Sequence, residues 1–226
     1  MRGSRSFEDG KLRLRAVVFD YGNVLCHPQQ PSDVEIMARI CGLPVPHFQD
    51  LYWKFRMPYD RGELTGDSYW AAVAAEDGQV LDRKQVAELT TLDAQSWSRP
   101  NRATIEWVEQ LRGAGLGLGL LSNMPFEISR YLTAHCDWLA LFDSFTFSCD
   151  VGRVKPDPVI YQICLEKLKV PAAEVLFLDD IAANVEGACA LGIHGLIFDT
   201  VEQTVARVKE RFEIPVPDFK KAPPGC

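Results

Sequence analysis

The sequence predicts an α/β fold, a doubly wound parallel sheet with an inserted α-helical cap. Short apolar runs bounded by turn residues recur along the chain, as is typical of buried strands in a parallel sheet. Helical patterns separate the later runs, which favours a parallel sheet with helices on both faces. After the first run, the stretch 27–99 contains helical patterns and no convincing strand, which indicates an inserted cap.

The apolar runs predict five strands, at 14–19, 116–121, 145–147, 175–178 and 195–198. In the sheet domain, apolar residues at helical spacing predict helices over 101–112, 125–138, 157–169 and 181–191. Within the third of these, for example, Ile160, Cys164 and Leu168 recur every four residues. In the cap, helices are expected near 32–41, 47–56, 66–76 and 82–96.

These elements predict a core domain of two segments, 13–26 and 100–212, with the cap at 27–99 between them. Residues 1–12 and 213–226 are expected to be tails. The second ends in the proline-rich EIPVPDFKKAPPGC, a composition typical of extended or disordered segments.

The composition limits the classes of function. With 24 Lys and Arg against 31 Asp and Glu, the formal charge of -7 argues against nucleic acid and anionic membranes as partners. Seven widely spaced cysteines without a Cys-x-x-Cys pair predict reduced thiols rather than disulfides or a zinc site. The chain has no apolar run near the roughly 20 residues that span a bilayer, and its polar first residues do not resemble a signal peptide. We therefore expect a cytoplasmic protein.

Polar side chains follow the predicted strands. In open α/β sheets ligands bind beyond the carboxyl ends of the strands, where this sequence places Asp20, Ser122, Asn123, Lys155, Asp179 and Asp180. Clustered carboxylates repel one another, and a hard cation such as Mg²⁺ relieves that repulsion while neutralising phosphate oxygens. The set is therefore suited to metal-assisted phosphoryl transfer.

Each residue type has a physical reason to be there. An aspartate such as Asp20 can attack phosphorus and divide hydrolysis into two steps. The Lys155 ammonium can hold the nucleophile and a phosphoryl oxygen together, and Ser122 can donate to a second oxygen. Asn184 lies one helical turn after Asp180 and is expected to face the same site.

Four motifs in this order resemble the haloacid dehalogenase superfamily, and within it the Mg²⁺-dependent phosphatases with a helical cap inserted after the first motif. The motifs are VVFDYGNVL, GLLSN, GRVKPDPVIY and VLFLDDIAANVEGACALGI, and the cap segment YDRGELT at 59–65 also matches. The first motif is also similar to that of bacterial sugar-phosphate phosphatases, which reads Asp-x-Gly-Asn-Val.

The resemblance implies a phosphatase that acts on a small phosphorylated metabolite such as a sugar phosphate. It makes Asp20 the nucleophile and a metal ligand, Asp179 and Asp180 further ligands, and Lys155 a catalytic residue that balances charge. Ser122 and Asn123, with Lys155, would bind or orient the phosphoryl group. The backbone carbonyl of Gly22 would be the remaining protein ligand of Mg²⁺.

Gly22 also departs from the family pattern, which has a second Asp at this position as general acid and base. General acid–base catalysis contributes about 10²–10⁴-fold, so the glycine predicts slower turnover unless another group substitutes. The candidates are His27 at the cap hinge and three cap residues, Tyr59, Asp60 and Glu63. A good leaving group or a substrate hydroxyl would also reduce the need.

Other features are interpreted as structural. The glycines that precede the second strand do not have the G-x-G-x-x-G spacing of a dinucleotide loop, so they predict a turn and close strand packing. Arg56 and Arg61 are expected to be solvated, although either is long enough to reach a phosphate or a sugar. The cap aromatics are expected to pack between helices: Tyr52, Trp53, Phe55, Tyr59, Tyr69 and Trp70.

Two other functions remain open. A 2-haloacid dehalogenase would share the fold and the attacking aspartate, but it has no use for the acidic pair Asp179 and Asp180. A non-catalytic phosphoryl-binding protein would explain Gly22. A phosphomutase is disfavoured because controlled transfer needs the missing acid.

Overall fold

The computed structural model describes residues 11–218, so the outer parts of both predicted tails lie outside the described residues. Five parallel strands form one sheet in the order β3-β2-β1-β4-β5, which confirms the predicted α/β fold. The strands are β1 (Ala16–Phe19), β2 (Gly117–Ser122), β3 (Ser144–Phe147), β4 (Val175–Asp179) and β5 (His194–Ile197). Each lies within two residues of a predicted apolar run.

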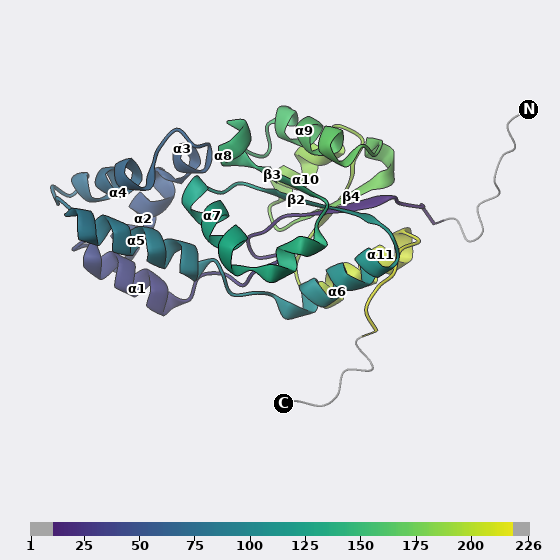
Figure 1. Ribbon diagram of the computed structural model, residues 1–226, viewed down its shortest axis with the longest axis horizontal. Helices are drawn as coiled ribbons and strands as arrows, with labels where there is room; N and C mark the ends of the chain where they lie inside the picture. The colour runs from purple at the N-terminus through teal and green to yellow at the C-terminus, as the bar shows by residue number, and fades with distance from the viewer. Residues whose placement is uncertain (1–10, 219–226) are drawn as a thin grey trace, which may run out of the picture.

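Both faces of the sheet are buried, because alternate residues of each strand point to opposite sides. In β1, Val17 and Phe19 pack in one hydrophobic cluster, whereas Ala16 and Val18 pack in another. The first face is covered by α6 (Arg102–Gly113), α7 (Phe126–His135) and α11 (Val201–Arg211). The second is covered by α9 (Pro158–Leu168) and α10 (Ala182–Cys189), as Figure 1 shows.

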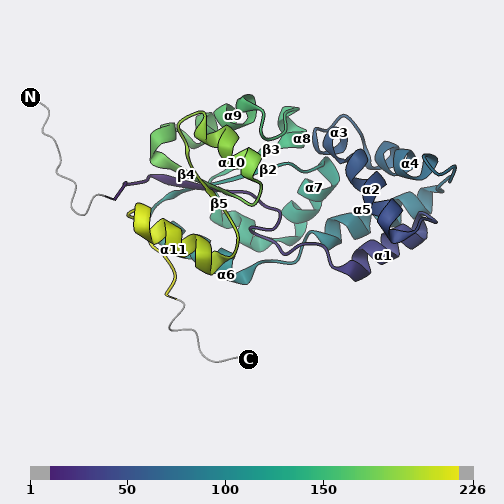
Figure 2. The same cartoon turned by 180° about the vertical axis from the view of Figure 1, so that it is seen from behind.

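Five helices between β1 and α6 pack around a hydrophobic core of their own, at the end of the molecule away from the described termini (Figure 2). They are α1 (Pro31–Ile40), α2 (Val45–Lys54), α3 (Arg56–Asp60), α4 (Gly66–Ala75) and α5 (Arg83–Ser96). A capping box begins α5, since Asp82 accepts from the backbone N–H of Gln85 and the Gln85 side chain accepts from that of Asp82. We call these helices the cap.

The structure has elements that the sequence patterns did not predict. The short helix α3 follows directly on α2, and α8 (Ser148–Val151) follows β3. Short 3-10 segments span Asp137–Leu141 and Ala172–Glu174. The amphipathic helix α11 is the last helix of the described chain.

Described residues at the two ends lie against the sheet domain. Leu12 pairs with Phe212, and the Trp107 indole N–H donates to the Pro215 carbonyl oxygen at 2.9 Å. Ile214 and Val216 pack on the same hydrophobic cluster as Trp107. The part of the C-terminal segment that the structure describes therefore packs against the sheet domain.

The glycine series has one of its expected roles, close packing, at Gly119, which lies within β2. A Cβ atom at Gly119 would lie 3.1 Å from Leu168 of α9 and 3.1 Å from Val18 of β1. Glycine thus allows α9 to pack closely on the centre of the sheet.

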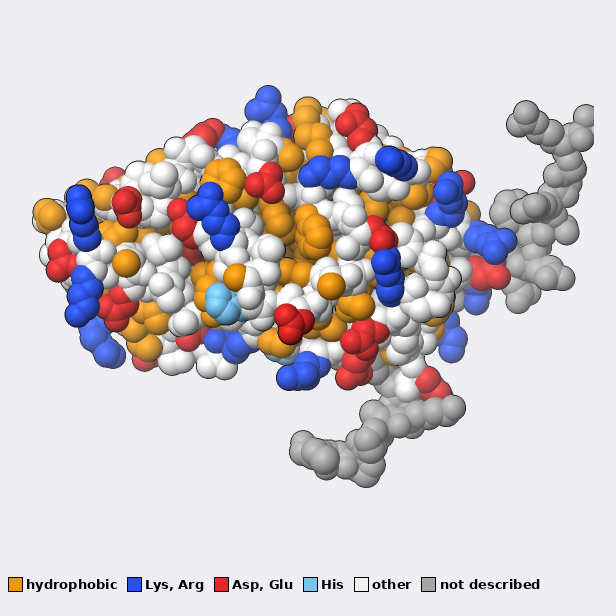
Figure 3. All heavy atoms as spheres, in the orientation of Figure 1, with side chains coloured by type: hydrophobic (Ala, Val, Ile, Leu, Met, Phe, Trp, Pro, Cys, Tyr) orange, Lys and Arg blue, Asp and Glu red, His pale blue; other side chains and the backbone are white. Residues whose placement is uncertain are grey.

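The molecular surface carries charges of both signs, interspersed on the face seen in Figure 3. Among the described residues, none of the helices is both long and apolar enough to cross a membrane.

Candidate active site

The predicted site residues meet at the carboxyl edge of three adjacent strands. Asp20 follows β1, Ser122 ends β2 and Asp179 ends β4. Since β1 pairs with both neighbours, the three side chains lie side by side. The backbone N–H of Asp20 donates to the carbonyl oxygen of Leu178 at 2.8 Å, which extends the β1–β4 ladder to the site.

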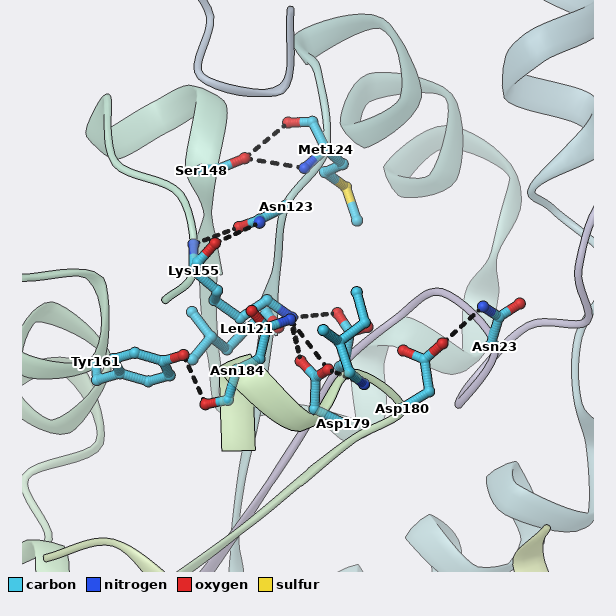
Figure 4. A network of polar contacts seen from close by, with 12 residues as sticks. Asn23, Leu121, Asn123, Met124, Ser148, Lys155, Tyr161, Asp179, Asp180 and Asn184 are labelled. Carbon is cyan, nitrogen blue, oxygen red and sulfur yellow. Dashed lines mark hydrogen bonds and ion pairs between the residues drawn. The ribbon is translucent and has the colours of Figure 1, made fainter. Parts of the chain in front are cut away.

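Lys155 lies at the centre of this edge (Figure 4). Its Nζ is 2.6 Å from Asp20 Oδ1, 2.6 Å from Asp179 Oδ2 and 3.1 Å from the Leu121 carbonyl oxygen. Burial alone would lower the pKa of Lys155, but the two carboxylates outweigh that effect and raise it. The ammonium therefore stays charged and holds the two acids together.

Three carboxylates converge closely enough to share one cation. Ligand oxygens of Asp20, Asp179 and Asp180 all lie within 4.8 Å of one another. Burial raises the pKa of Asp20 to about 7. The positive charge of Lys155 lowers this pKa, whereas the negative charges of Asp179 and Asp180 raise it further. An excess of buried negative charge of this kind is what a hard divalent cation relieves, so the donor set suits Mg²⁺. Gly22 lines the same cavity, and its carbonyl oxygen accepts no hydrogen bond from the described residues.

Two asparagines hold the acids in place. Asn184 Nδ2 donates to both oxygens of Asp179, at 3.0 and 3.1 Å, so this residue does face the site as expected. Asn23 Nδ2 donates to Asp180 Oδ2 at 2.8 Å. Asn23 has a φ of 57°, a left-handed conformation that asparagine tolerates better than most residues. The Gly-Asn sequence after Tyr21 was the signal for this turn.

Ser122 and Asn123 differ in what they contact. Ser122 is buried and lines the cavity. The Asn123 side chain forms two hydrogen bonds with the backbone of Lys155. Its Oδ1 accepts from the Lys155 N–H at 2.8 Å, and its Nδ2 donates to the Lys155 carbonyl oxygen at 3.1 Å. Asn123 thus orients Lys155, and a contact with the phosphoryl group stays a prediction for both residues.

His27 is not brought into the site. Its side chain is exposed and does not line the cavity, and its backbone N–H donates to the Arg99 carbonyl oxygen.

The cap closes the cavity with residues whose roles the sequence patterns did not reveal. The cavity has a volume of about 200 Å³, and Trp53, Arg56, Asp60 and Trp97 form its cap side. Trp53 was expected to pack between helices, but 54% of its surface is exposed, in contrast to the buried Tyr52. Its position at the cavity gives a physical reason for an exposed indole.

The expectation that Arg56 is solvated is wrong. The residue is 7% exposed, and its guanidinium forms ion pairs with Asp60 at 2.8 Å and with Asp93 at 3.1 Å. It also donates to the Tyr52 hydroxyl, which in turn donates to Asp93 at 2.7 Å. Asp93 comes from α5, so its pairing could not be found from local spacing in the sequence.

Comparison with known proteins identifies relatives of this chain. The family described as haloacid dehalogenase-like hydrolase matches residues 14–192. Phosphatase MT3486 of Mycobacterium tuberculosis is 31% identical over 198 residues, which cover 85% of this chain and 91% of that protein. Acyl-CoA dehydrogenase family member 10 of Mus musculus is 34% identical over 95% of this chain, which spans only 20% of the mouse protein.

A solved structure shares the fold. A HAD family enzyme from Bacteroides thetaiotaomicron, crystallised with magnesium and inorganic phosphate, has a TM-score of 0.67 and 19% sequence identity. The match covers 81% of this chain and 93% of that one.

Proposed function

The chain belongs to the haloacid dehalogenase-like hydrolases, and we propose that it is a Mg²⁺-dependent phosphatase that acts on a small phosphorylated metabolite. The observation that carries this proposal is the convergence of the Asp20, Asp179 and Asp180 oxygens within 4.8 Å, with Lys155 between two of them. The similarity to phosphatase MT3486 of Mycobacterium tuberculosis supports the same reaction class.

In the proposed reaction Asp20 bonds to phosphorus and the bond from phosphorus to the leaving oxygen breaks. A poor leaving group takes up a proton and departs as an alcohol, whereas an acidic one departs as a phenolate. Water then hydrolyses the aspartyl-phosphate and restores the Asp20 carboxylate. Mg²⁺, held by the three aspartates and the Gly22 carbonyl oxygen, would neutralise charge on the phosphoryl oxygens. Lys155 and Ser122 would bind the remaining oxygens, with Asn123 holding the Lys155 backbone.

The small cavity suits a small leaving group, and we propose sugar phosphates as the first class to test. The acidic cluster disfavours a 2-haloacid dehalogenase, since three adjacent carboxylates without a cation would repel a carboxylate substrate. The six cysteines of the described chain are free, which supports the proposed cytoplasmic location.

A turnover assay tests the proposal. The wild type and Asp20→Asn would be assayed for phosphate release from 4-nitrophenyl phosphate and a sugar-phosphate panel, with Mg²⁺ and with EDTA. We expect turnover that needs both Mg²⁺ and Asp20. Phosphate binding without any turnover by the wild type would instead support a non-catalytic phosphoryl-binding protein, the function that Gly22 favours.

A further inference from the structure

The cavity lacks a core carboxyl at the Gly22 position, so the proton for the leaving group must come from elsewhere. Most titratable groups that line the cavity already have another role or a hydrogen-bond partner. Asp20 is the proposed nucleophile, Lys155 is an ammonium paired with two acids, and Asp180 belongs to the metal cluster. The Tyr21 hydroxyl donates to the Trp97 carbonyl oxygen at 2.6 Å, and burial raises its pKa far above the usual range.

Asp60 is the remaining carboxyl among the described residues that line the cavity. Its Oδ1 accepts from Arg56 Nε at 2.8 Å, whereas Oδ2 accepts no hydrogen bond from the described residues. The side chain keeps 13% of its surface exposed although the residue as a whole is buried. One oxygen is therefore fixed by Arg56 while the other is free for a proton.

The cap is fastened to the core at this residue. The Ser148 hydroxyl donates to the Asp60 carbonyl oxygen, and the same hydroxyl oxygen accepts from the Met124 backbone N–H at 2.9 Å. Met124 follows Ser122 and Asn123 on the loop after β2. Ser148 thus ties the backbone of Asp60 to the loop that carries proposed phosphate-binding residues.

We propose that Asp60 is the general acid and base of this enzyme, and that it replaces from the cap the carboxyl absent at Gly22. The inference rests on the phosphatase function proposed above. In the first step Asp20 bonds to phosphorus, the bond from phosphorus to the leaving oxygen breaks, and Asp60 gives its proton to that oxygen. In the second step water bonds to phosphorus, the bond to Asp20 breaks, and Asp60 takes a proton from the water.

The electrostatic surroundings suit this exchange. Burial raises the pKa of Asp60 to about 6, Arg56 opposes the rise, Asp93 of α5 adds to it, and Lys155 of the core lowers it. A carboxyl with such a pKa holds and releases a proton near neutral pH, where acid–base catalysis is most effective. For a poor leaving group whose departure limits the rate, kcat should fall as the pH rises through about 6.

The test compares two substrates that differ in their need for an acid. Wild type and Asp60→Asn would be assayed with Mg²⁺ on 4-nitrophenyl phosphate, whose leaving group departs without protonation, and on 2-phenylethyl phosphate, whose alkoxide does not. We expect Asp60→Asn to reduce kcat/KM on the alkyl ester by about 10²–10⁴-fold, and to leave the aryl ester within about tenfold of wild type. The matched control is Glu63→Gln, an exposed neighbour that does not line the cavity and should keep both rates.

A second variant separates chemistry from damage to the fold. A Cβ atom at Gly22 would meet only Trp97, at 3.7 Å, so Gly22→Asp in the Asp60→Asn background should restore alkyl ester hydrolysis. Equal losses on both esters, no loss on the alkyl ester, or a loss that Gly22→Asp does not recover would overturn the proposal. None of these outcomes contradicts the phosphatase function as long as the wild type hydrolyses the aryl ester. If neither ester is hydrolysed in an Asp20-dependent way, the phosphatase function itself is refuted.

Discussion

Asp93→Asn should destabilise the cap, because it removes one carboxylate from a buried ion-pair network. Asp93 is 1% exposed and accepts from the Tyr52 hydroxyl at 2.7 Å and from Arg56 at 3.1 Å. Hydrogen bonds to charged groups contribute about 1.5–3 kcal/mol each, which gives about 3–6 kcal/mol for the two. The loss is limited because an asparagine at position 93 has nearly the volume of aspartate and keeps one oxygen as an acceptor. The ion pair between Arg56 and Asp60 also remains. We therefore expect a loss of about 3 kcal/mol, at the lower end of the cost of breaking a buried pair.

Unfolding by urea and by heat would be monitored through tryptophan fluorescence. Trp97 reports on the network because its indole N–H donates to the Tyr52 hydroxyl. For a domain of this size the expected loss lowers Tm by about 6–12 °C. The control is Glu88→Gln, an exposed carboxylate on the same helix, which should change stability by less than about 0.5 kcal/mol. If Asp93→Asn is no more destabilising than Glu88→Gln, the network does not stabilise the cap and the reasoning is wrong.

Two further predictions concern the core. Lys155→Met removes the ammonium that neutralises Asp20 and Asp179, so Mg²⁺ should bind more tightly in calorimetric titration while turnover falls; weaker Mg²⁺ binding would contradict the assigned electrostatics. Ser148→Ala removes the donor to the Asp60 carbonyl oxygen and the acceptor for Met124, which should cost about 1–3 kcal/mol for the unpaired groups and should lower kcat on alkyl esters more than on aryl esters. Equal effects on both esters would show that this contact does not position Asp60.

The positions of the core site residues were predictable because they depend on one local rule. Parallel strands bring their carboxyl ends to one edge, so a residue that ends or follows an apolar run is placed by the run itself. Asp20, Ser122 and Asp179 meet for this reason. Lys155 was expected on the loop after the third strand. The helix α8 lies between that strand and Lys155, but the Lys155 ammonium still reaches Asp20 and Asp179.

The cap side of the site was less predictable, because it depends on contacts between helices distant in sequence. Arg56 was expected to be solvated, and its ion pairs with Asp60 and with Asp93 of α5 explain its burial. Trp53 and Tyr52 are adjacent and equally aromatic, so composition cannot tell which packs and which lines the cavity. Among Tyr59, Asp60 and Glu63 the decision again required the tertiary structure, which places Asp60 at the cavity.

An acid on the cap would make proton transfer depend on the contacts that hold the cap on the core. A carboxyl at the Gly22 position would be held beside Asp20 by the core itself, whereas Asp60 is held near the core by contacts that cross between the two parts. In one contact the Ser148 hydroxyl donates to the Asp60 carbonyl oxygen. In the other the Gly66 backbone N–H donates to Glu127 Oε1, on α7, at 2.7 Å. Substrates with good leaving groups would react without these contacts, but substrates with poor leaving groups would need them. Selection among substrates would then act on the chemical step as well as on binding, because a poor leaving group would receive a proton only where these contacts place Asp60 beside it.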